Sequence, residues 1–347
     1  MSDNFVAETA ARIFADLADP QDVNRARDDG WKAVLWRALA ENGLTLAWVP
    51  EEQGGSGAEL SDGFAVMGVA GRYAAAVPLA ETLLAGWLLS RAGLKCPDGA
   101  MSVAPARPGD TITLNANGTL SGRARAVPFA KDAKHLAVLA GSSVALVETA
   151  ACRTNDGTNL ASEASNNVTF DKVKPLALAA AKGIDPTALM LMGCVVRSVQ
   201  TAGALEAVLD FTVRYANERI AFEKPIGKFQ AVQHNLARLA GETAAAMTAA
   251  QSAADAIGRA EEFDDGIFLE ATAAKIRSAE AAQEGAAIAH QVHGAIGFTN
   301  EHILHRYTLR MLGWRDDFGN ESHWAAALGN RVCARGADEF WPLVAAR

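Results

Sequence analysis

Apolar and polar residues alternate along the chain with two different periods, and the change from one period to the other marks the boundaries between predicted domains. Up to about residue 98, apolar positions recur every three or four residues, as in AETAARIFADLA, GWKAVLWRALAENGL and LAETLLAGWLLSRAGL. From about 99 to 182, short β-branched runs (DTITL, HLAVL, SVALV) are separated by turn-forming stretches such as NANGTLSG and AGSS. The pattern predicts a helical domain over residues 1–98 and a small β domain over residues 99–182.

Helical periodicity returns after residue 183 and continues towards the end of the chain. Asp185 can accept N-cap hydrogen bonds and Pro186 suits the first position of a helix. Further helical runs extend from Gln230 to about Glu261 and from about Asp265 to His293, and two shorter ones follow. Their many alanines allow close helix packing. We therefore expect a C-terminal four-helix bundle over residues 183–347, within an α+β fold that is mainly α.

Composition and charge narrow the class of protein. Half of the 347 residues are hydrophobic and 21% are charged, so the chain can bury substantial cores. Its net charge of -8 argues against an extended nucleic-acid surface. The four cysteines form no C-x-x-C pair, and no apolar run approaches the roughly 18 residues of a membrane span. These features predict a soluble cytoplasmic protein without nucleic-acid or membrane partners.

Two short stretches carry candidate chemistry. RIAFEKPIGKFQ, residues 219–230, lies between two predicted helices; an arginine fork suits a pyrophosphate and aromatic faces can shelter a base. The simpler interpretation is an interhelix loop whose arginine pairs with a carboxylate. QVHGAIGF, residues 291–298, places small residues where a helix ends, so that backbone can approach a ligand. Its simpler interpretation is a helix C-cap.

These stretches, in a chain ordered as helices, β domain and helical bundle, resemble the acyl-CoA dehydrogenase family of flavoproteins. The likeness is strongest over residues 185–324, and LTLAWVPEEQGGSG is similar to the family's P-E-x-x-G-G-x-G loop. In the family, R-x-x-F-G-x-x-I-x-x-F-Q and Q-x-x-G-G-x-G-F contact the adenosine and pyrophosphate end of an FAD bound mainly by a neighbouring subunit. Glu223 and Ala295 replace glycines of these two patterns. The FAD contacts that the resemblance implies are Arg219, Phe222, Phe229, Gln230, Gln291, His293, Gly294, Ala295 and Asn320.

The catalytic glutamate of the family has no counterpart at either of its two usual places. The alignment puts Phe318 at the glutamate of the family's Tyr-Glu-Gly-Thr turn, with Asn320 at the threonine. The alternative place, near the start of the first bundle helix, holds Gly193. Neither residue can take the α-proton of a thioester, and a general base contributes about a hundred- to ten-thousand-fold to the rate.

Three carboxylates near Phe318 are the remaining candidates for a base. They are Asp316, Asp317 and Glu321, in RDDFGNES. The alternative, which we favour, is an acidic turn that is solvated or paired with arginine, because Arg315 is next in the chain. The identity of a catalytic residue therefore stays open.

The family's T-E-P-x-x-G-S-D loop, which holds the flavin ring and the thioester, is also missing from the corresponding region, MSVAPARPGDTITL. What remains are the residues that a subunit lends to its neighbour's flavin. The resemblance thus implies a subunit of a heteromeric acyl-CoA dehydrogenase, a dimer or tetramer, acting on a CoA thioester of a bulky group such as a steroid side chain. An electron-transfer flavoprotein would accept the electrons. The alternative is a catalytically silent structural or regulatory subunit that keeps the fold without cofactor.

Histidines cluster in the C-terminal region and raise the question of a metal. His290/His293 and His302/His305 are i, i+3 pairs that could share a helix face. No cysteine or glutamate completes a signature such as H-E-x-x-H. We therefore predict no metal site, and expect His293 to pack or hydrogen-bond at the helix end.

Overall fold

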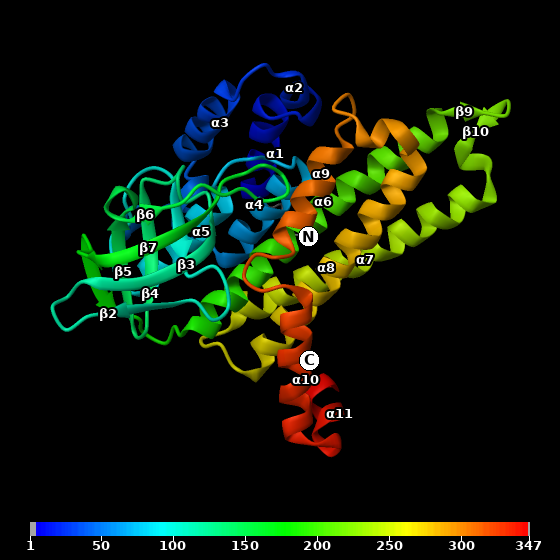
Figure 1. Cartoon of the computed structure of the whole chain (residues 1–347). Coiled ribbons are helices and arrows are strands. Elements are labelled where there is room, and N and C mark those ends of the chain that lie inside the picture. The colour runs from blue at the N-terminus through cyan, green and yellow to red at the C-terminus, as the bar shows by residue number, and fades with distance from the viewer. Residues whose placement is uncertain (1–4, 346–347) are drawn as a thin grey trace.

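The computed structural model describes residues 5–345 and has the predicted α+β fold, mainly α (Figure 1). Its N-terminal part is helical: α1 (Phe5–Leu17), α2 (Pro20–Arg25), α3 (Gly30–Glu41), α4 (Leu60–Arg72) and α5 (Leu79–Arg91). The stretch PEEQGGSG forms a short 3₁₀ turn, Glu51–Gln53, between α3 and α4. Helix α4 packs against α6 (Pro186–Glu218) of the bundle, and this contact joins the N-terminal part to the C-terminal part.

The middle of the chain forms two four-stranded sheets that enclose a small apolar core. One sheet has the order β1 (Met101–Ala104), β4 (His135–Ala140), β5 (Ser143–Glu148), β8 (Ala177–Ala180). The other has the order β2 (Thr111–Leu114), β3 (Leu120–Pro128), β7 (Ser165–Val173), β6 (Arg153–Thr154). Ala126 on β3 and the connection between β1 and β2 face the C-terminal helical part. Together with that part they line a cavity, which is described with the candidate site.

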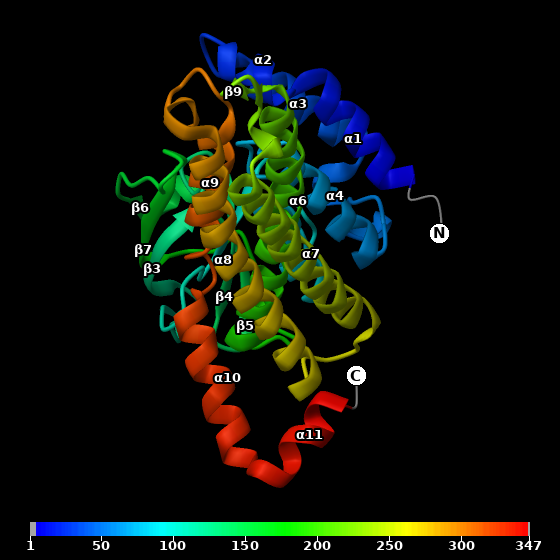
Figure 2. The same cartoon turned by 90° about the vertical axis from the view of Figure 1, so that its right-hand side faces the viewer.

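Three long helices dominate the C-terminal part: α6 (Pro186–Glu218), α7 (Gln230–Arg259) and α8 (Asp265–His293). Asp185 caps α6 by accepting a hydrogen bond from the Ala188 amide, with Pro186 at the first position as expected. Helices α9 (Leu304–Trp314) and α10 (Glu321–Arg335) lie along α8 and together form the fourth member of the bundle (Figure 2). A third terminal helix, α11 (Ala337–Ala345), follows, where the sequence pattern predicted only two.

Helix α6 corrects the expectation that no apolar run is long enough to cross a membrane. It passes that test by length and composition, but 94% of its most apolar window is buried inside the molecule. Its burial against α4, α7 and α8 identifies it as the central helix of the core rather than a membrane span.

Between α6 and α7 the chain forms a small hairpin, β9 (Ile220–Ala221) and β10 (Lys224–Pro225), at one end of the bundle (Figure 1). We call this end, residues 215–230 and 291–298, the bundle tip. The β domain lies beside the other half of the bundle, so the tip projects away from it.

Candidate functional site

The bundle tip brings the two sequence stretches together. Helix α6 ends in Glu218, and α8 ends in His293 with Gly294 at φ +64°, the left-handed region that glycine adopts without strain. The Tyr215 hydroxyl donates to the His293 carbonyl at 3.2 Å, and the two rings stack with centroids 4.4 Å apart. The helix ends carrying Arg219 and Gly294 are therefore held side by side.

Arg219 has no acidic partner in the part of the chain that the structure describes. It caps α6, its side chain is exposed, and no carboxylate of residues 5–345 lies within ion-pair distance. The simpler interpretation, an arginine paired with a carboxylate, is thus not what the isolated chain forms. The guanidinium is free to bind an anion.

Large apolar side chains of the bundle tip also face solvent. Phe222 is 89% exposed and Phe298 is 73% exposed. Phe222 and Phe229 meet edge to face, with centroids 6.1 Å apart, and the Lys224 ammonium lies 4.4 Å from the Phe229 ring centre. Exposed aromatic rings beside unpaired cations are typical of a surface that another molecule covers.

The turn of the β9–β10 hairpin has backbone angles that favour glycine at residue 223. Phe222 has φ +51° and Glu223 has φ +67°, the left-handed values required at both central residues of a two-residue type I′ turn. Glu223, which replaces the family pattern's glycine, adopts this conformation at a cost in backbone strain.

The remaining predicted tip residues take different places. Gln230 opens α7, Gln291 is exposed on the last turn of α8, and Ala295 lies in the 3₁₀ turn Gly294–Phe298. His293 is buried, and its Nδ1 bonds to the Ala289 carbonyl at 2.8 Å. His293 therefore supports the helix end from inside.

Far from the tip, the two positions that the resemblance assigns to a catalytic base meet in space. Gly193 lies on α6 and Phe318 on the turn between α9 and α10, yet a Cβ atom on Gly193 would overlap the Phe318 ring. The ring is fully buried, and Phe318 has φ +57°. The place where a carboxylate would stand is filled by an aromatic ring packed on bare helix backbone.

The turn that carries Phe318, residues 314–320, is held by hydrogen bonds from four other segments of the chain. The Phe318 amide donates to the Ala106 carbonyl at 3.0 Å, while its own carbonyl accepts from Trp324 Nε1 at 3.0 Å and from Cys194 Sγ at 3.4 Å. The Lys275 ammonium, 1% exposed, donates to the Trp314 carbonyl at 2.7 Å. Burial lowers the pKa of Lys275 to about 8.

A buried ion-pair network lies under the same turn. Arg197 on α6 pairs with Glu81 on α5 and donates from Nε to Asp317 at 3.0 Å, and also to Gln200. Arg107, from the β1–β2 connection, approaches Asp317 at 3.6 Å. Burial raises the pKa of Glu81, which Arg197 opposes. The network links all three parts of the chain.

The three candidate carboxylates separate into different roles. Asp317 is buried and paired with Arg197, while Glu321 pairs with Arg315. The favoured interpretation was an acidic turn that is solvated or paired with arginine; the arginine next in the chain, Arg315, pairs with Glu321 rather than with either aspartate, because neighbouring residues on a helical turn point in different directions. Burial would raise the pKa of Glu321, but hydrogen bonds from Arg315 and the backbone outweigh it and lower that pKa. Both carboxylates are engaged by arginine side chains, so neither is free to approach a substrate as a base.

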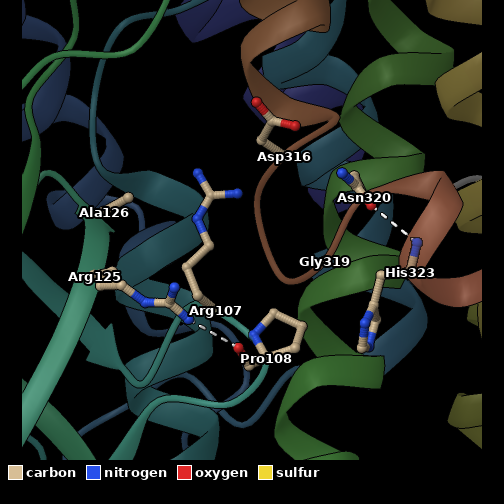
Figure 3. Close-up of a pocket in the computed structure, with 8 residues that line it drawn as sticks. All are labelled: Arg107, Pro108, Arg125, Ala126, Asp316, Gly319, Asn320 and His323. Carbon is tan, nitrogen blue, oxygen red and sulfur yellow. Dashed lines mark hydrogen bonds between the residues drawn. The ribbon is translucent and has the colours of Figure 1, made fainter.

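Asp316 faces a cavity of about 410 Å³ between the β domain and the 314–320 turn (Figure 3). Arg107 extends across this cavity, and Arg125 turns back to Asp110 and the Pro108 carbonyl. Asn320 caps α10 by accepting from the His323 amide at 2.9 Å. The lining residues are Arg107, Pro108, Arg125, Ala126, Asp316, Gly319, Asn320 and His323.

The C-terminal histidines form an aromatic cluster. The His293 and His302 rings lie 4.6 Å apart, and Phe211 approaches both. Burial, with the neighbouring histidines, lowers the pKa of His302 to about 4. Among residues 5–345, no group of three or more His, Cys, Asp or Glu side chains is placed to hold a metal ion.

Sequence reasoning missed the buried network and Lys275. Glu81, Arg197 and Lys275 lie in the apolar stretches PLAETLL, CVVRSVQ and TAAKIRSA. A charged residue inside an apolar helical run is the signal that could have found them, because charges are buried only when they are paired or hydrogen-bonded.

Comparisons with known proteins give a consistent result. The N-terminal and C-terminal domain models of acyl-CoA dehydrogenase match residues 3–95 and 187–320. Acyl-CoA dehydrogenase IpdE2 of Mycobacterium tuberculosis is 30% identical over 309 residues, 88% of this chain and 89% of that protein. Acyl-CoA dehydrogenase FadE28 of the same organism is 30% identical over 326 residues, 86% of this chain and 92% of that one.

Solved structures share the fold over nearly the whole chain. A structure described as a Tcur3481-Tcur3483 steroid ACAD variant has a TM-score of 0.82 and 26% identity, covering 96% of this chain and 98% of its own. The ChsE4-ChsE5 complex from Mycobacterium tuberculosis gives a TM-score of 0.81 at 22% identity, with 95% and 97% covered. The chain belongs to the acyl-CoA dehydrogenase family, as a flavin-dependent oxidoreductase or a subunit of one.

Proposed function

We propose that this chain is one subunit of a heteromeric acyl-CoA dehydrogenase and lends the adenosine half-site of the FAD to a catalytic partner. The observation that carries the proposal is the contrast between its two half-sites. The bundle tip offers an unpaired guanidinium and exposed aromatic rings, whereas the position of the base is filled by Phe318 against Gly193.

The residues of the tip fit the nucleotide end of FAD. Arg219 supplies several donors and a permanent charge for a pyrophosphate. Phe222 and Phe229 offer aromatic faces for the adenine. An added Cβ at Gly294 would meet nothing within 4 Å, so open space lies beside the helix end. Gln230, Gln291, His293, Ala295 and, from the far turn, Asn320 remain proposed contacts that the resemblance alone supports.

The ring end fits less well. When bound, FAD would accept a hydride from the β-carbon of the acyl-CoA. The same reaction needs a carboxylate that takes the α-proton. Arg107, Arg125 and Asp316 line the cavity beside the turn, but no carboxylate stands at residue 193 or 318. The α-proton is then removed by the partner subunit.

The comparisons support a bulky acyl-CoA substrate and a two-component assembly, because a steroid enzyme and a two-protein complex have the same fold. We place the assembly in the cytoplasm, with an electron-transfer flavoprotein as the acceptor. The absence of any disulfide among Cys96, Cys152, Cys194 and Cys333 supports a reducing compartment.

The test is flavin content in the co-expressed assembly. The chain co-purified with a candidate partner from a neighbouring gene is expected to be yellow, and Arg219→Ala is expected to remove most of the flavin. Arg259→Ala, at the far end of α7, is the matched control and should keep it. Unchanged flavin in Arg219→Ala would refute the donor role. Colourless protein alone and with the partner would support the silent-subunit alternative.

A further inference from the structure

A groove outside the flavin half-sites runs between α3 and the β domain. It consists of two cavities, of about 680 and 530 Å³, within the size range of small-molecule sites. They share five lining residues and are therefore continuous: Asp29, Lys32, Ala76, Phe129 and Asp132. We call this the α3 groove; α3 lies next to the β domain at that side of the molecule (Figure 1).

The two halves of the α3 groove differ in chemistry. One half is lined mainly by apolar residues, among them Trp36, Val77 and Pro78, with Arg37 beside them and Phe129 at the junction. The other half is polar: it is lined by Lys131, Arg306 and Arg310 and by Asp156 and Glu163 of the β6–β7 connection. An apolar half that continues into a polar half suits a ligand with an apolar body and a polar end.

Within the polar half, two carboxylates are matched by cations and one guanidinium has no ion-pair partner among the described residues. Arg310 pairs with Glu163 at 2.6 Å, and Lys131 pairs with Asp156. Arg306 is half-buried, and no carboxylate among residues 5–345 lies within ion-pair distance of it. Burial and the neighbouring Arg310 lower the pKa of Arg306, while the more distant Glu163 and Asp29 oppose that shift. A bound anion would stabilise the charged form of a cation that is partly desolvated and lies beside another cation.

Asp132 decides the orientation of such a ligand. It lies where the two halves meet and forms no ion pair with the described residues. Its charge would repel an anionic group from the junction, so the anionic end points to Arg306 and the apolar body to Trp36 and Val77.

We propose that the α3 groove binds a small amphiphilic monoanion, of the medium-chain carboxylate class, with its carboxylate on Arg306. The site is separate from Arg219 and from the cavity beside Phe318, and it does not depend on flavin. A failure here would leave the proposed function untouched.

The probe is decanoate, titrated into the full-length chain by calorimetry below its micellar concentration. One molecule is expected to bind per chain, and decyltrimethylammonium, which has the same tail and the opposite charge, is expected not to bind. Arg306→Gln should weaken decanoate binding roughly tenfold or more, the usual effect of removing a hydrogen bond to a charged group. Trp36→Ala should also weaken it, from the apolar half.

Two further variants make the result decisive. Arg306→Lys keeps the charge and should retain most of the affinity, which separates a lost charge from a lost fold. Arg259→Gln, a surface arginine on α7, should bind as the wild type does. The proposal is overturned if decanoate does not bind, if the cationic amphiphile binds equally well, or if a folded Arg306→Gln binds decanoate unchanged.

Discussion

The bundle tip and the 314–320 turn are two ends of one candidate flavin site, and they are built in opposite ways. At the tip, Arg219 pairs with no carboxylate of residues 5–345 and Phe222 faces solvent, so both side chains are available to a ligand. At the turn, Arg197 bonds to Asp317, Lys275 to the Trp314 carbonyl and Trp324 to the Phe318 carbonyl, all inside the chain. The proposed donor role explains the difference: the tip is left unpaired for another molecule, whereas the turn is closed by internal contacts.

The largest effect is expected from breaking the buried network. Arg197→Met leaves Glu81 buried without its counterion and Asp317 with only the more distant Arg107, and we expect a loss of about 3–5 kcal/mol in the free energy of unfolding. Arg315→Met, which breaks the more exposed pair with Glu321, should cost about 1 kcal/mol or less. Urea unfolding of both variants measures the difference. Equal losses would mean that the turn is not locked by this network.

Burial of Lys275 makes the stability of the chain depend on pH. Its pKa is about 8 in the folded chain and 10.5 unfolded, so between these values the unfolded chain holds a proton that the folded chain has released. Relative to Lys275→Met, the wild type should therefore gain stability as pH rises from 8 to 10.5, by up to about 3 kcal/mol. Urea titrations across that range measure the gain. Lys182→Met, at the surface, is the control; a flat difference for Lys275→Met would contradict the burial argument.

A smaller loss of stability is expected from a side chain added at Gly193. Gly193→Ala forces a methyl group into the Phe318 ring, and overpacking of this kind costs about 1–3 kcal/mol. Gly241 on α7 is a matched control, because its added Cβ meets nothing within 4 Å and alanine there should stabilise the helix by up to about 1 kcal/mol. Thermal unfolding compares the two. If Phe318→Leu does not reduce the cost of Gly193→Ala, the two residues are not in contact.

The smallest effect is expected at the tip. Glu223→Gly removes the strain of a left-handed residue and should stabilise the hairpin by up to about 1 kcal/mol. Lys224→Gly, in the same hairpin without a positive φ, should bring no such gain. Hydrogen exchange of the Ile226 amide, which donates to the Arg219 carbonyl, reports the hairpin locally. Faster exchange in Glu223→Gly would contradict the strain argument.

The sequence predicted the long elements well because their signals are local. Asp185 and Pro186 mark the start of α6, and Gly294 follows the last residue of α8. Helix α4 was not recognised separately, and α11 was not expected as a third terminal helix. The hairpin β9–β10 was missed because neither Phe222 nor Glu223 is a residue that usually forms a left-handed turn.

The site was predictable where it depended on motifs and unpredictable where it depended on packing. Arg219 and Gly294 were identified from their stretches, and their roles remain predictions. The contact between Gly193 and Phe318 joins residues 125 positions apart, and the pairing of Arg197 with Glu81 joins the N-terminal and C-terminal parts of the chain only after folding. No periodicity or spacing encodes such contacts; only the observation that charges sit in apolar helices points to them.

Under the proposed donor role, the contact between Gly193 and Phe318 makes a base at this position hard to introduce in evolution. No side chain can enter at residue 193 while the ring remains, and removing the ring first leaves a hole in the core that costs about 3–5 kcal/mol. A descendant regaining proton abstraction in one step must do so at residue 318, with a carboxylate that the same core has to accept. Dependence on a partner, once established, is thus preserved by ordinary steric exclusion.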